Sequence, residues 1–199
     1  MRTGILGGTF DPIHEGHLAA ARVALDCAPL DRVLFIPGAL PPHRGPAVAR
    51  SDQRLEMSRL ATAGEPRFEV SDIEVRRGGK SYTADTIRQL KRLYPDDELF
   101  LILGWDAARL FRSWREPDAI RRLVTVVVVT RPGTPDPEAK LLQAAGLDPA
   151  GTLLCPGHTP DISGSALREA IATGKPVSGS LPPAVARYVA ANGLYGDNR

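Results

Sequence analysis

Short apolar runs alternate with segments of helical periodicity along the whole chain, and this alternation constrains the fold more than any other feature. Strands that alternate with helices build a parallel sheet wrapped by helices. The sequence therefore predicts one doubly wound, Rossmann-like α/β domain over residues 1–199, helical from about residue 160 onward. The predicted strands are TGIL near Thr3, RVLFIP from Arg32, FEVSDIEV from Phe68, ELFLIL from Glu98, VTVVVVT from Val124 and TLLC from Thr152. The predicted helices cover Glu15–Cys27, Ser51–Ala63, Tyr82–Tyr94, Asp106–Phe111 and Pro137–Ala145.

Two helical patterns, ISGSALREAIATGK and SLPPAVARYVAANGLY, follow the last predicted strand. In the second pattern Ser180 is a predicted N-cap, Pro182 and Pro183 fall in the first turn, and Gly193 is a predicted C-cap. Among the strands, the run Val126–Val129 is β-branched on both faces. A strand of this kind is expected in the centre of the sheet.

The composition is that of an ordinary globular protein and argues against several functional classes. With 43% hydrophobic and 24% charged residues, a chain of 199 residues can bury a sizeable core. The net charge of +2 argues against a nucleic-acid surface but allows a local basic cluster around a small anion. Neither a signal peptide nor an apolar run of about 18 residues is present, so we expect a cytoplasmic protein with no membrane partner.

Cys27 and Cys155 lie far apart in the chain and belong to no CxxC pair. This spacing suggests neither a disulfide framework nor a zinc ribbon. The expectation is therefore two small buried thiols in a reducing cytosol.

The segment GGTFDPIHEGH, from Gly7 to His17, directly follows the first predicted strand. Gly7 and Gly8 allow a sharp turn and a close approach to a ligand, and the next helix offers unpaired N–H groups and the positive end of its dipole. The segment is therefore a predicted anion site. It matches neither the dinucleotide fingerprint GxGxxG nor a Walker A loop, so other side chains must hold the phosphate.

His14 and His17 are three residues apart at the start of that helix, which predicts that both rings lie on one face and donate to phosphate oxygens. A metal site is the weaker alternative, because the sequence offers no third histidine or cysteine nearby. Two helix-capping histidines are a second alternative. Asp11 and Pro12 shape the turn into the helix under each of these interpretations.

The same segment resembles the GGTFDPxHxGH signature of nucleotidyltransferases that join a mononucleotide to ATP, and is most similar to that of the nicotinate-nucleotide adenylyltransferases. Further stretches resemble this family in order along nearly the whole chain: PPHR from Pro41, RRGGKSYTADTIRQL from Arg76, LILGWDAARLFRSWRE from Leu101 and VVVVTRPG from Val126. In PPHR, Arg44 replaces the family's lysine and keeps the charge. The family's ISSTxIR motif reads ISGSALR here, so Gly164 stands in place of a serine and its hydroxyl is missing.

The resemblance implies AMP transfer from ATP to nicotinate mononucleotide without a covalent intermediate, in NAD biosynthesis, with Mg²⁺ bound through the ATP. The implied catalytic residues are His14, His17, Arg44 and Arg168. The implied ATP-binding residues are Gly7, Gly8, Thr9, Phe10, His17, Gly104, Asp106, Ile162, Ser163, Ser165 and Arg168. The implied mononucleotide-binding residues are Asp11, His43, Arg44, Tyr82, Thr83, Trp114 and Arg131.

From the residues alone, several alternatives stay open. Arg168 could be a solvated surface cation, Asp106 an N-cap, and Trp114 part of the core. A pantetheine-phosphate adenylyltransferase would share the HxGH core, and an enzyme that prefers nicotinamide mononucleotide would share nearly every motif. A nucleotide-binding regulator without catalysis is a third alternative, suggested by Gly164. The sequence also leaves a homo-oligomer open.

Overall fold

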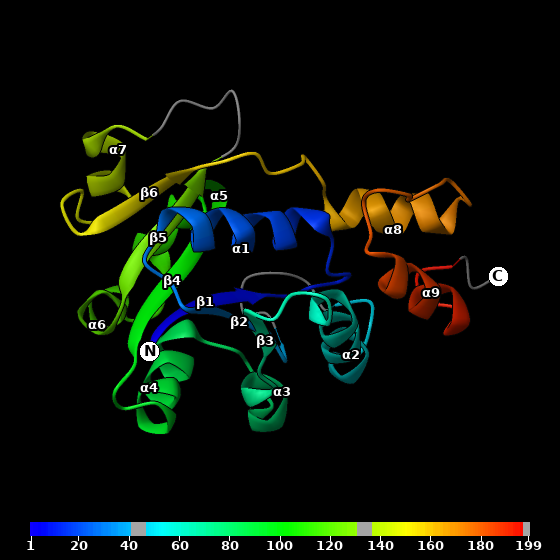
Figure 1. The fold of residues 1–199 in the computed structure, drawn as a ribbon, viewed down its shortest axis with the longest axis horizontal. Coiled ribbons are helices and arrows are strands. Elements are labelled where there is room, and N and C mark those ends of the chain that lie inside the picture. Colours follow the sequence, from blue (N-terminus) through cyan, green and yellow to red (C-terminus); the bar gives the residue numbers. More distant parts are fainter. Residues whose placement is uncertain (41–46, 131–136, 197–199) are drawn as a thin grey trace. The chain divides into compact units, whose positions relative to one another are not determined.

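The computed structural model describes residues 1–40, 47–130 and 137–196, and six strands of these residues form one sheet in the order β3-β2-β1-β4-β5-β6. The strands are β1 (Arg2–Gly8), β2 (Arg32–Pro37), β3 (Phe68–Val70), β4 (Glu98–Gly104), β5 (Thr125–Thr130) and β6 (Thr152–Pro156). Pairs β1–β4, β4–β5 and β5–β6 run parallel, and Figure 1 shows β4, β5 and β6 side by side. The order is that of a doubly wound sheet and confirms the predicted fold class.

Most helices of the described residues lie at the places where helical periodicity predicts them. They are α1 (Glu15–Cys27), α2 (Ser51–Thr62), α3 (Ile73–Arg77), α4 (Thr83–Leu93), α5 (Trp105–Ala108), α6 (Pro117–Leu123), α7 (Ala139–Ala144), α8 (Gly164–Ala172) and α9 (Pro183–Ala191), with a 3₁₀ turn η1 (Phe111–Ser113). Helix α1 has the predicted bounds. The short helices α3 and α6 were not predicted, and α3 lies within the stretch FEVSDIEV that was predicted as a strand.

The chain divides into two compact units. Unit 1 comprises residues 1–7, 20–34 and 82–159, and unit 2 comprises residues 8–19, 35–81 and 160–199. Strands β1 and β2 and helix α1 each have residues in both units. In unit 1, α4 packs against α6, and in unit 2, α2 packs against β3 and α9. The signature segment belongs to unit 2 from Gly8 to His17. Both C-terminal helices, drawn in orange and red in Figure 1, also belong to unit 2.

Four expectations about these elements were wrong. The predicted strand FEVSDIEV ends at Val70, because the chain turns and begins α3 at Ile73. Strand β5 is not central, since it lies between β4 and the edge strand β6. Any strand covered on both faces can carry a continuous valine run, so the run does not report distance from the edge. The N-cap of α9 is Pro182 rather than Ser180, and its C-cap is Asn192 rather than Gly193, which follows one position later with a positive φ of 58°.

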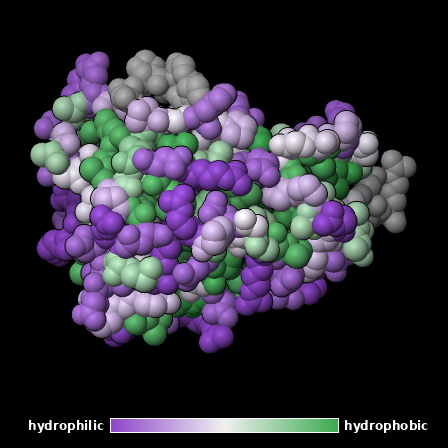
Figure 2. All heavy atoms as spheres, viewed as in Figure 1, coloured by the Kyte–Doolittle hydropathy of each residue, from purple (hydrophilic) through white to green (hydrophobic). Residues whose placement is uncertain are grey.

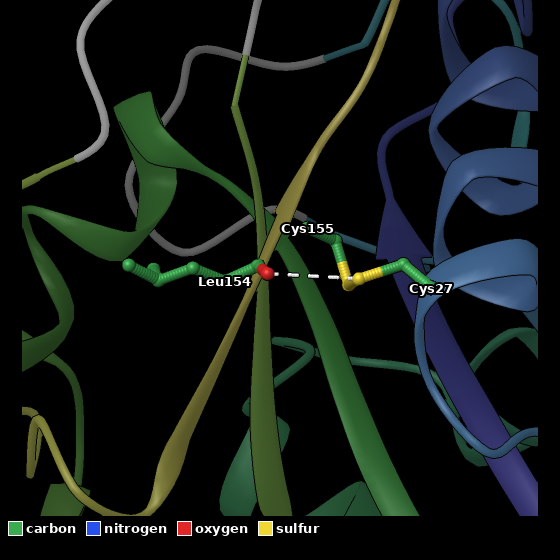
Figure 3. Close-up of a disulfide and its surroundings, with 3 residues drawn as sticks. All are labelled: Cys27, Leu154 and Cys155. Carbon is green, nitrogen blue, oxygen red and sulfur yellow. Dashed lines mark hydrogen bonds between the residues drawn. A yellow bond between two sulfur atoms is a disulfide. The ribbon is translucent and has the colours of Figure 1, made fainter.

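The two cysteines form a disulfide, so the expectation of two separate thiols was wrong. Cys27 ends α1 and Cys155 lies in β6, and both belong to unit 1. Figure 3 shows the bond and the carbonyl oxygen of Leu154, which lies 3.6 Å from the Cys27 Sγ. Because 128 positions separate the two cysteines, only the packing of α1 beside β6 brings them together.

Buried apolar side chains fill the interior of both units, and Figure 2 shows hydrophilic residues over much of the face in view. Unit 1 also buries a polar cluster, in which Asp97 accepts hydrogen bonds from the Thr3 hydroxyl (2.7 Å), the terminal amine of Met1 (3.0 Å) and the Arg32 guanidinium (3.1 Å). Burial opposes ionisation, but these three donors outweigh it and lower the pKa of Asp97. No helix of the described residues is long and apolar enough to cross a membrane.

Candidate functional site

The loop that follows β1 is held in a strained conformation by its own side chains. Phe10 has a positive φ of 49°, which is costly for a residue other than glycine. Its ring is 2% exposed and lies over Gly8, where a Cβ atom would come within 2.5 Å of the Phe10 ring. Gly8 is therefore required for close packing within the protein, whereas a Cβ at Gly7 would meet open space.

His14 and His17 lie together at the beginning of α1, as predicted. Their rings stack with centroids 3.7 Å apart, and the Phe10 ring packs edge-on against His17 at 4.9 Å. The His14 backbone N–H donates to His17 Nδ1 at 3.2 Å, so a neutral His17 ring carries its proton on Nε2. Gly16 is the small residue that this arrangement needs, because a Cβ there would lie 3.0 Å from His14 Nδ1.

Asp11 organises the loop from within. It is 7% exposed, and its carboxylate accepts hydrogen bonds from the backbone N–H groups of Val48 (2.7 Å) and Ala49 (3.1 Å) and from the Tyr195 hydroxyl (2.7 Å). Burial, together with this hydrogen bond to a carboxylate, raises the pKa of Tyr195, which stays a neutral donor. Sequence reasoning missed Tyr195, since nothing in the residues around it indicates a partner 184 positions earlier in the chain.

Helix α8 brings the second motif, ISGSALR, to the same loop within unit 2. The Arg168 guanidinium donates to the Asp11 backbone carbonyl at 2.7 Å and to the Ser165 hydroxyl at 3.3 Å, and it lies 3.9 Å from the Asp11 carboxylate. Ser163 is the N-cap, and its hydroxyl accepts from the Ala166 N–H at 3.4 Å. A Cβ at Gly164 would lie 3.4 Å from the Asp11 carbonyl oxygen, so this departure from the family motif is not enforced by space.

Arg54 of α2 is the largest fully buried side chain of the described residues, with 1% exposure. Its guanidinium donates to four backbone carbonyls: Ala49 (3.1 Å), Thr9 (2.6 Å), Gly38 (2.7 Å) and Ala39 (2.9 Å). Burial lowers the pKa of this guanidinium, partly offset by the charge of Asp11, and an arginine remains charged in such a site. Sequence reasoning missed Arg54, although it shares a helix face with the buried Met57 and Ser58, three and four positions on.

One feature of the predicted anion site differs in the structure. The first N–H groups of α1 are partly engaged, because Glu15 N–H donates to the Ser180 carbonyl (3.0 Å) and His17 N–H to the His14 carbonyl (2.9 Å). Ser180, which was expected to cap α9, thus contributes its carbonyl oxygen to the beginning of α1. The loop before the helix and the two histidine rings are consequently the better candidates for phosphate contacts.

In unit 1, two predicted ATP-binding residues lie at the end of β4 and just after it: Gly104 and Asp106. The strand order reverses between β1 and β4, and ligands of open α/β sheets bind outside the carboxyl ends at such a point. Gly7 and Gly104 lie at these ends. The N-cap of α5 is Gly104, so the N-cap alternative for Asp106 was wrong: the helix begins directly at Trp105, and Asp106, 74% exposed, lies in its first turn.

Three predicted mononucleotide-binding residues also belong to unit 1. Tyr82 is the N-cap of α4 and Thr83 its first residue, and the Tyr82 ring lies under the Arg115 guanidinium at 4.7 Å. Trp114 is half-buried and packs against Phe111, with ring centroids 5.4 Å apart. The alternative of a partly buried core tryptophan therefore describes its packing. His43, Arg44 and Arg131 lie outside the described residues.

A family model described as cytidylyltransferase-like matches residues 5–170. The chain therefore belongs to the cytidylyltransferase-like family, and it is a nucleotidyltransferase. It is 46% identical over 217 aligned positions to the "Probable nicotinate-nucleotide adenylyltransferase" of Citrifermentans bemidjiense, covering 100% of both chains. It is 45% identical over 195 positions to a protein of the same name from Thermus thermophilus, covering 98% of this chain and 100% of the relative. These relatives place it with the nicotinate-nucleotide adenylyltransferases.

Solved structures agree on the fold. Plasmodium falciparum nicotinic acid mononucleotide adenylyltransferase complexed with NaAD has a TM-score of 0.76 at 17% identity, over 98% of this chain and 97% of that chain. The same enzyme complexed with APC has a TM-score of 0.75 at 17% identity, over 98% and 96%. At such identities the likeness supports the shared fold alone.

Proposed function

We propose that this protein transfers AMP from ATP to the 5′-phosphate of nicotinate mononucleotide, forming nicotinate adenine dinucleotide (deamido-NAD) and pyrophosphate in NAD biosynthesis. The observation that carries the proposal is the contact between the two signature motifs in unit 2, where Arg168 of the second motif bonds to Asp11 of the first. Full-length relatives at 45–46% identity carry the corresponding name. A cytoplasmic location goes with the proposal, because ATP and mononucleotides are metabolites of that compartment.

In this reaction an oxygen of the mononucleotide phosphate attacks the α-phosphorus of ATP, and the bond from that phosphorus to the bridging oxygen of pyrophosphate breaks. The attacking oxygen is already ionised, so no general base is required and no covalent intermediate forms. The remaining task is to align two anions and to stabilise the charge that builds on the α-phosphate and pyrophosphate. A single in-line displacement inverts the configuration at the α-phosphorus, whereas a covalent intermediate would retain it.

His17 is well suited to this stabilisation. Its Nδ1 accepts from the His14 N–H, so the proton of a neutral ring is on Nε2, and an imidazole N–H is a suitable donor to a phosphate oxygen. His14 and Arg168 are proposed catalytic residues beside His17. Arg168 and the loop from Gly7 to Phe10 also belong to the proposed ATP-binding set, with Ile162, Ser163 and Ser165 at the beginning of α8, Gly104 at the end of β4 and Asp106 just after it. Arg44 is the proposed fourth catalytic residue.

Mg²⁺ enters this scheme as part of the nucleotide substrate. Among residues 1–40, 47–130 and 137–196, no group of three or more His, Cys, Asp or Glu side chains is arranged to hold a metal ion. The predicted mononucleotide-binding roles of Asp11, His43, Arg44, Tyr82, Thr83, Trp114 and Arg131 belong to the same proposal.

The proposal also assigns the nicotinate carboxylate to the first turn of α4. Its N-cap, Tyr82, makes no side-chain capping hydrogen bond, and the positive end of a helix dipole stabilises a carboxylate. An amide would gain less at this position, so the acid mononucleotide is the preferred acceptor.

The test compares pyrophosphate release from MgATP with nicotinate mononucleotide, nicotinamide mononucleotide and pantetheine phosphate as acceptors. A kcat/KM at least about tenfold higher for the first supports the proposal, since one charged hydrogen bond is worth that much. Equal or better use of the amide would refute the acid preference, and a preference for pantetheine phosphate would refute the acceptor altogether. Binding of ATP without release for any acceptor would favour a regulator.

A further inference from the structure

Within the described part of the chain, Arg54 donates to backbone carbonyls, and these come from three separate segments of unit 2. One is Thr9 in the strained loop after β1, two are Gly38 and Ala39 after β2, and the last is Ala49 just before α2. A guanidinium can hold several acceptors at once because its donors form a rigid planar fork. The side chain thus fixes the orientation of four peptide groups.

In a trans peptide group the carbonyl and the following N–H point in opposite directions. Two of the four groups show this directly. The Gly38 carbonyl accepts from Arg54, and the following Ala39 N–H donates to the Ser81 hydroxyl at 2.9 Å. The Ala49 carbonyl accepts from Arg54, and the following Arg50 N–H donates to the Gln53 side chain at 3.0 Å.

The third peptide group lies in the loop that follows β1. Thr9 gives Arg54 its shortest contact, 2.6 Å, and the next N–H belongs to Phe10. This peptide is trans, since the cis bond of the loop is between Asp11 and Pro12. The Phe10 N–H therefore points away from the buried guanidinium. Phe10 is also the residue with the costly φ of 49°, and the pinned Thr9 carbonyl holds one side of that conformation.

The charge of Arg54 adds to this geometric effect. A guanidinium that is 1% exposed is poorly screened by solvent, and its field extends to the loop it bonds. The four carbonyls present their negative ends to Arg54, so the positive ends of the same peptide groups face away from it. An anion that approaches the Thr9–Phe10 peptide group meets both the N–H and the field of the cation behind it.

We infer that Arg54 is a positioning residue for adenylyl transfer: it holds the Thr9–Phe10 peptide group so that the Phe10 N–H donates to the ATP phosphates. The inference rests on the proposed function, because it takes the loop as the phosphate-binding element. Arg54 itself touches neither substrate.

The test uses Arg54→Lys, which keeps the charge but cannot bridge four carbonyls, and Arg59→Lys as a matched control on the same helix. Arg59 is 53% exposed, and its nearest acids, Glu56 and Asp72, lie 3.8 and 3.9 Å away. Calorimetry measures the binding of MgATP and of adenosine, which lacks phosphates. For Arg54→Lys we expect the dissociation constant of MgATP to rise about tenfold or more and that of adenosine to change less than about twofold. Arg59→Lys should change neither.

Unchanged MgATP affinity in a folded Arg54→Lys protein would overturn the inference, and so would equal weakening of MgATP and adenosine, which indicates a general structural role. If thermal unfolding shows that Arg54→Lys does not fold, the amide resonance of Phe10 in the ¹⁵N-labelled wild-type protein decides. It should shift strongly with MgATP and little with adenosine, and no shift with MgATP overturns the inference. Wild-type protein that binds MgATP but forms no dinucleotide would refute the proposed function alone, since the binding comparison requires no turnover.

Discussion

The Arg168 guanidinium donates a 2.7 Å hydrogen bond to the backbone carbonyl oxygen of Asp11, a residue 157 positions earlier in the chain. The bond joins the helix of the second signature motif to the loop of the first. The Arg168 side chain is 30% exposed, and its guanidinium also donates to the Ser165 hydroxyl at 3.3 Å. One side chain thus serves both the shape of the loop and its charge.

Arg168→Ala should weaken MgATP binding strongly and leave the fold largely intact. The variant loses a cation for the triphosphate and the hydrogen bond to Asp11, so we expect the KM for ATP to rise by about tenfold or more. Steady-state pyrophosphate release measures this KM. Arg187→Ala, an exposed position on α9, is the matched control and should behave as wild type. Wild-type KM and kcat in the Arg168 variant would exclude the residue from ATP binding.

His17→Ala should lower kcat by about two orders of magnitude or more, because it removes a donor aimed at charge that develops in the transition state. Urea unfolding should change little, since His17 is only partly buried. His158→Ala, at an exposed position outside both motifs, controls for loss of an imidazole. A His17→Ala enzyme that turns over at nearly the wild-type rate would contradict the assigned role.

Much of this site could be predicted from the sequence because it lies in local patterns. The spacing of His14 and His17 fixes a shared helix face, and both the strand before them and the bounds of α1 follow from periodicity. The need for a glycine at position 8 is also a local feature. In the structure, however, the space that a Cβ would need is taken by the Phe10 ring rather than by a ligand.

The unpredicted features depend on contacts between distant segments. Arginine is usually exposed, so nothing local marks Arg54 as the centre of four carbonyls. The hydroxyl of Tyr195 reaches Asp11 across 184 positions. The two Cα atoms of the disulfide likewise lie 5.7 Å apart only because of the packed fold.

The Cys27–Cys155 disulfide should add to the stability of the oxidised protein. It closes a loop of 128 positions, and loss of a native disulfide costs about 2–5 kcal/mol of the free energy of unfolding. Urea unfolding of a Cys27→Ser/Cys155→Ser double variant measures the loss. A thiol reductant should reproduce it in wild-type protein and leave the double variant unchanged. Identical unfolding of oxidised wild type and double variant would contradict the prediction.

Asp97 should make stability depend on acid pH. Its pKa in the folded state lies below the reference value of 3.8, so its contribution is present above that pH and is lost as the pH falls through the folded-state pKa. Asp97→Asn should cost about 1–3 kcal/mol near neutral pH and flatten the decline below pH 4. Unfolding free energies measured across this range test both effects, with the exposed neighbour Asp96→Asn as control. An unchanged slope in Asp97→Asn would show that the buried cluster does not set the acid dependence.

The most direct test of the proposed reaction identifies its products. MgATP labelled in its β- and γ-phosphates is incubated with nicotinate mononucleotide, and the mixture is resolved by chromatography with mass detection. Direct adenylyl transfer predicts unlabelled nicotinate adenine dinucleotide and labelled pyrophosphate in equal amounts, with both formed about a hundredfold or more slower in His17→Ala. Absence of the dinucleotide, or label released as phosphate rather than pyrophosphate, would contradict it.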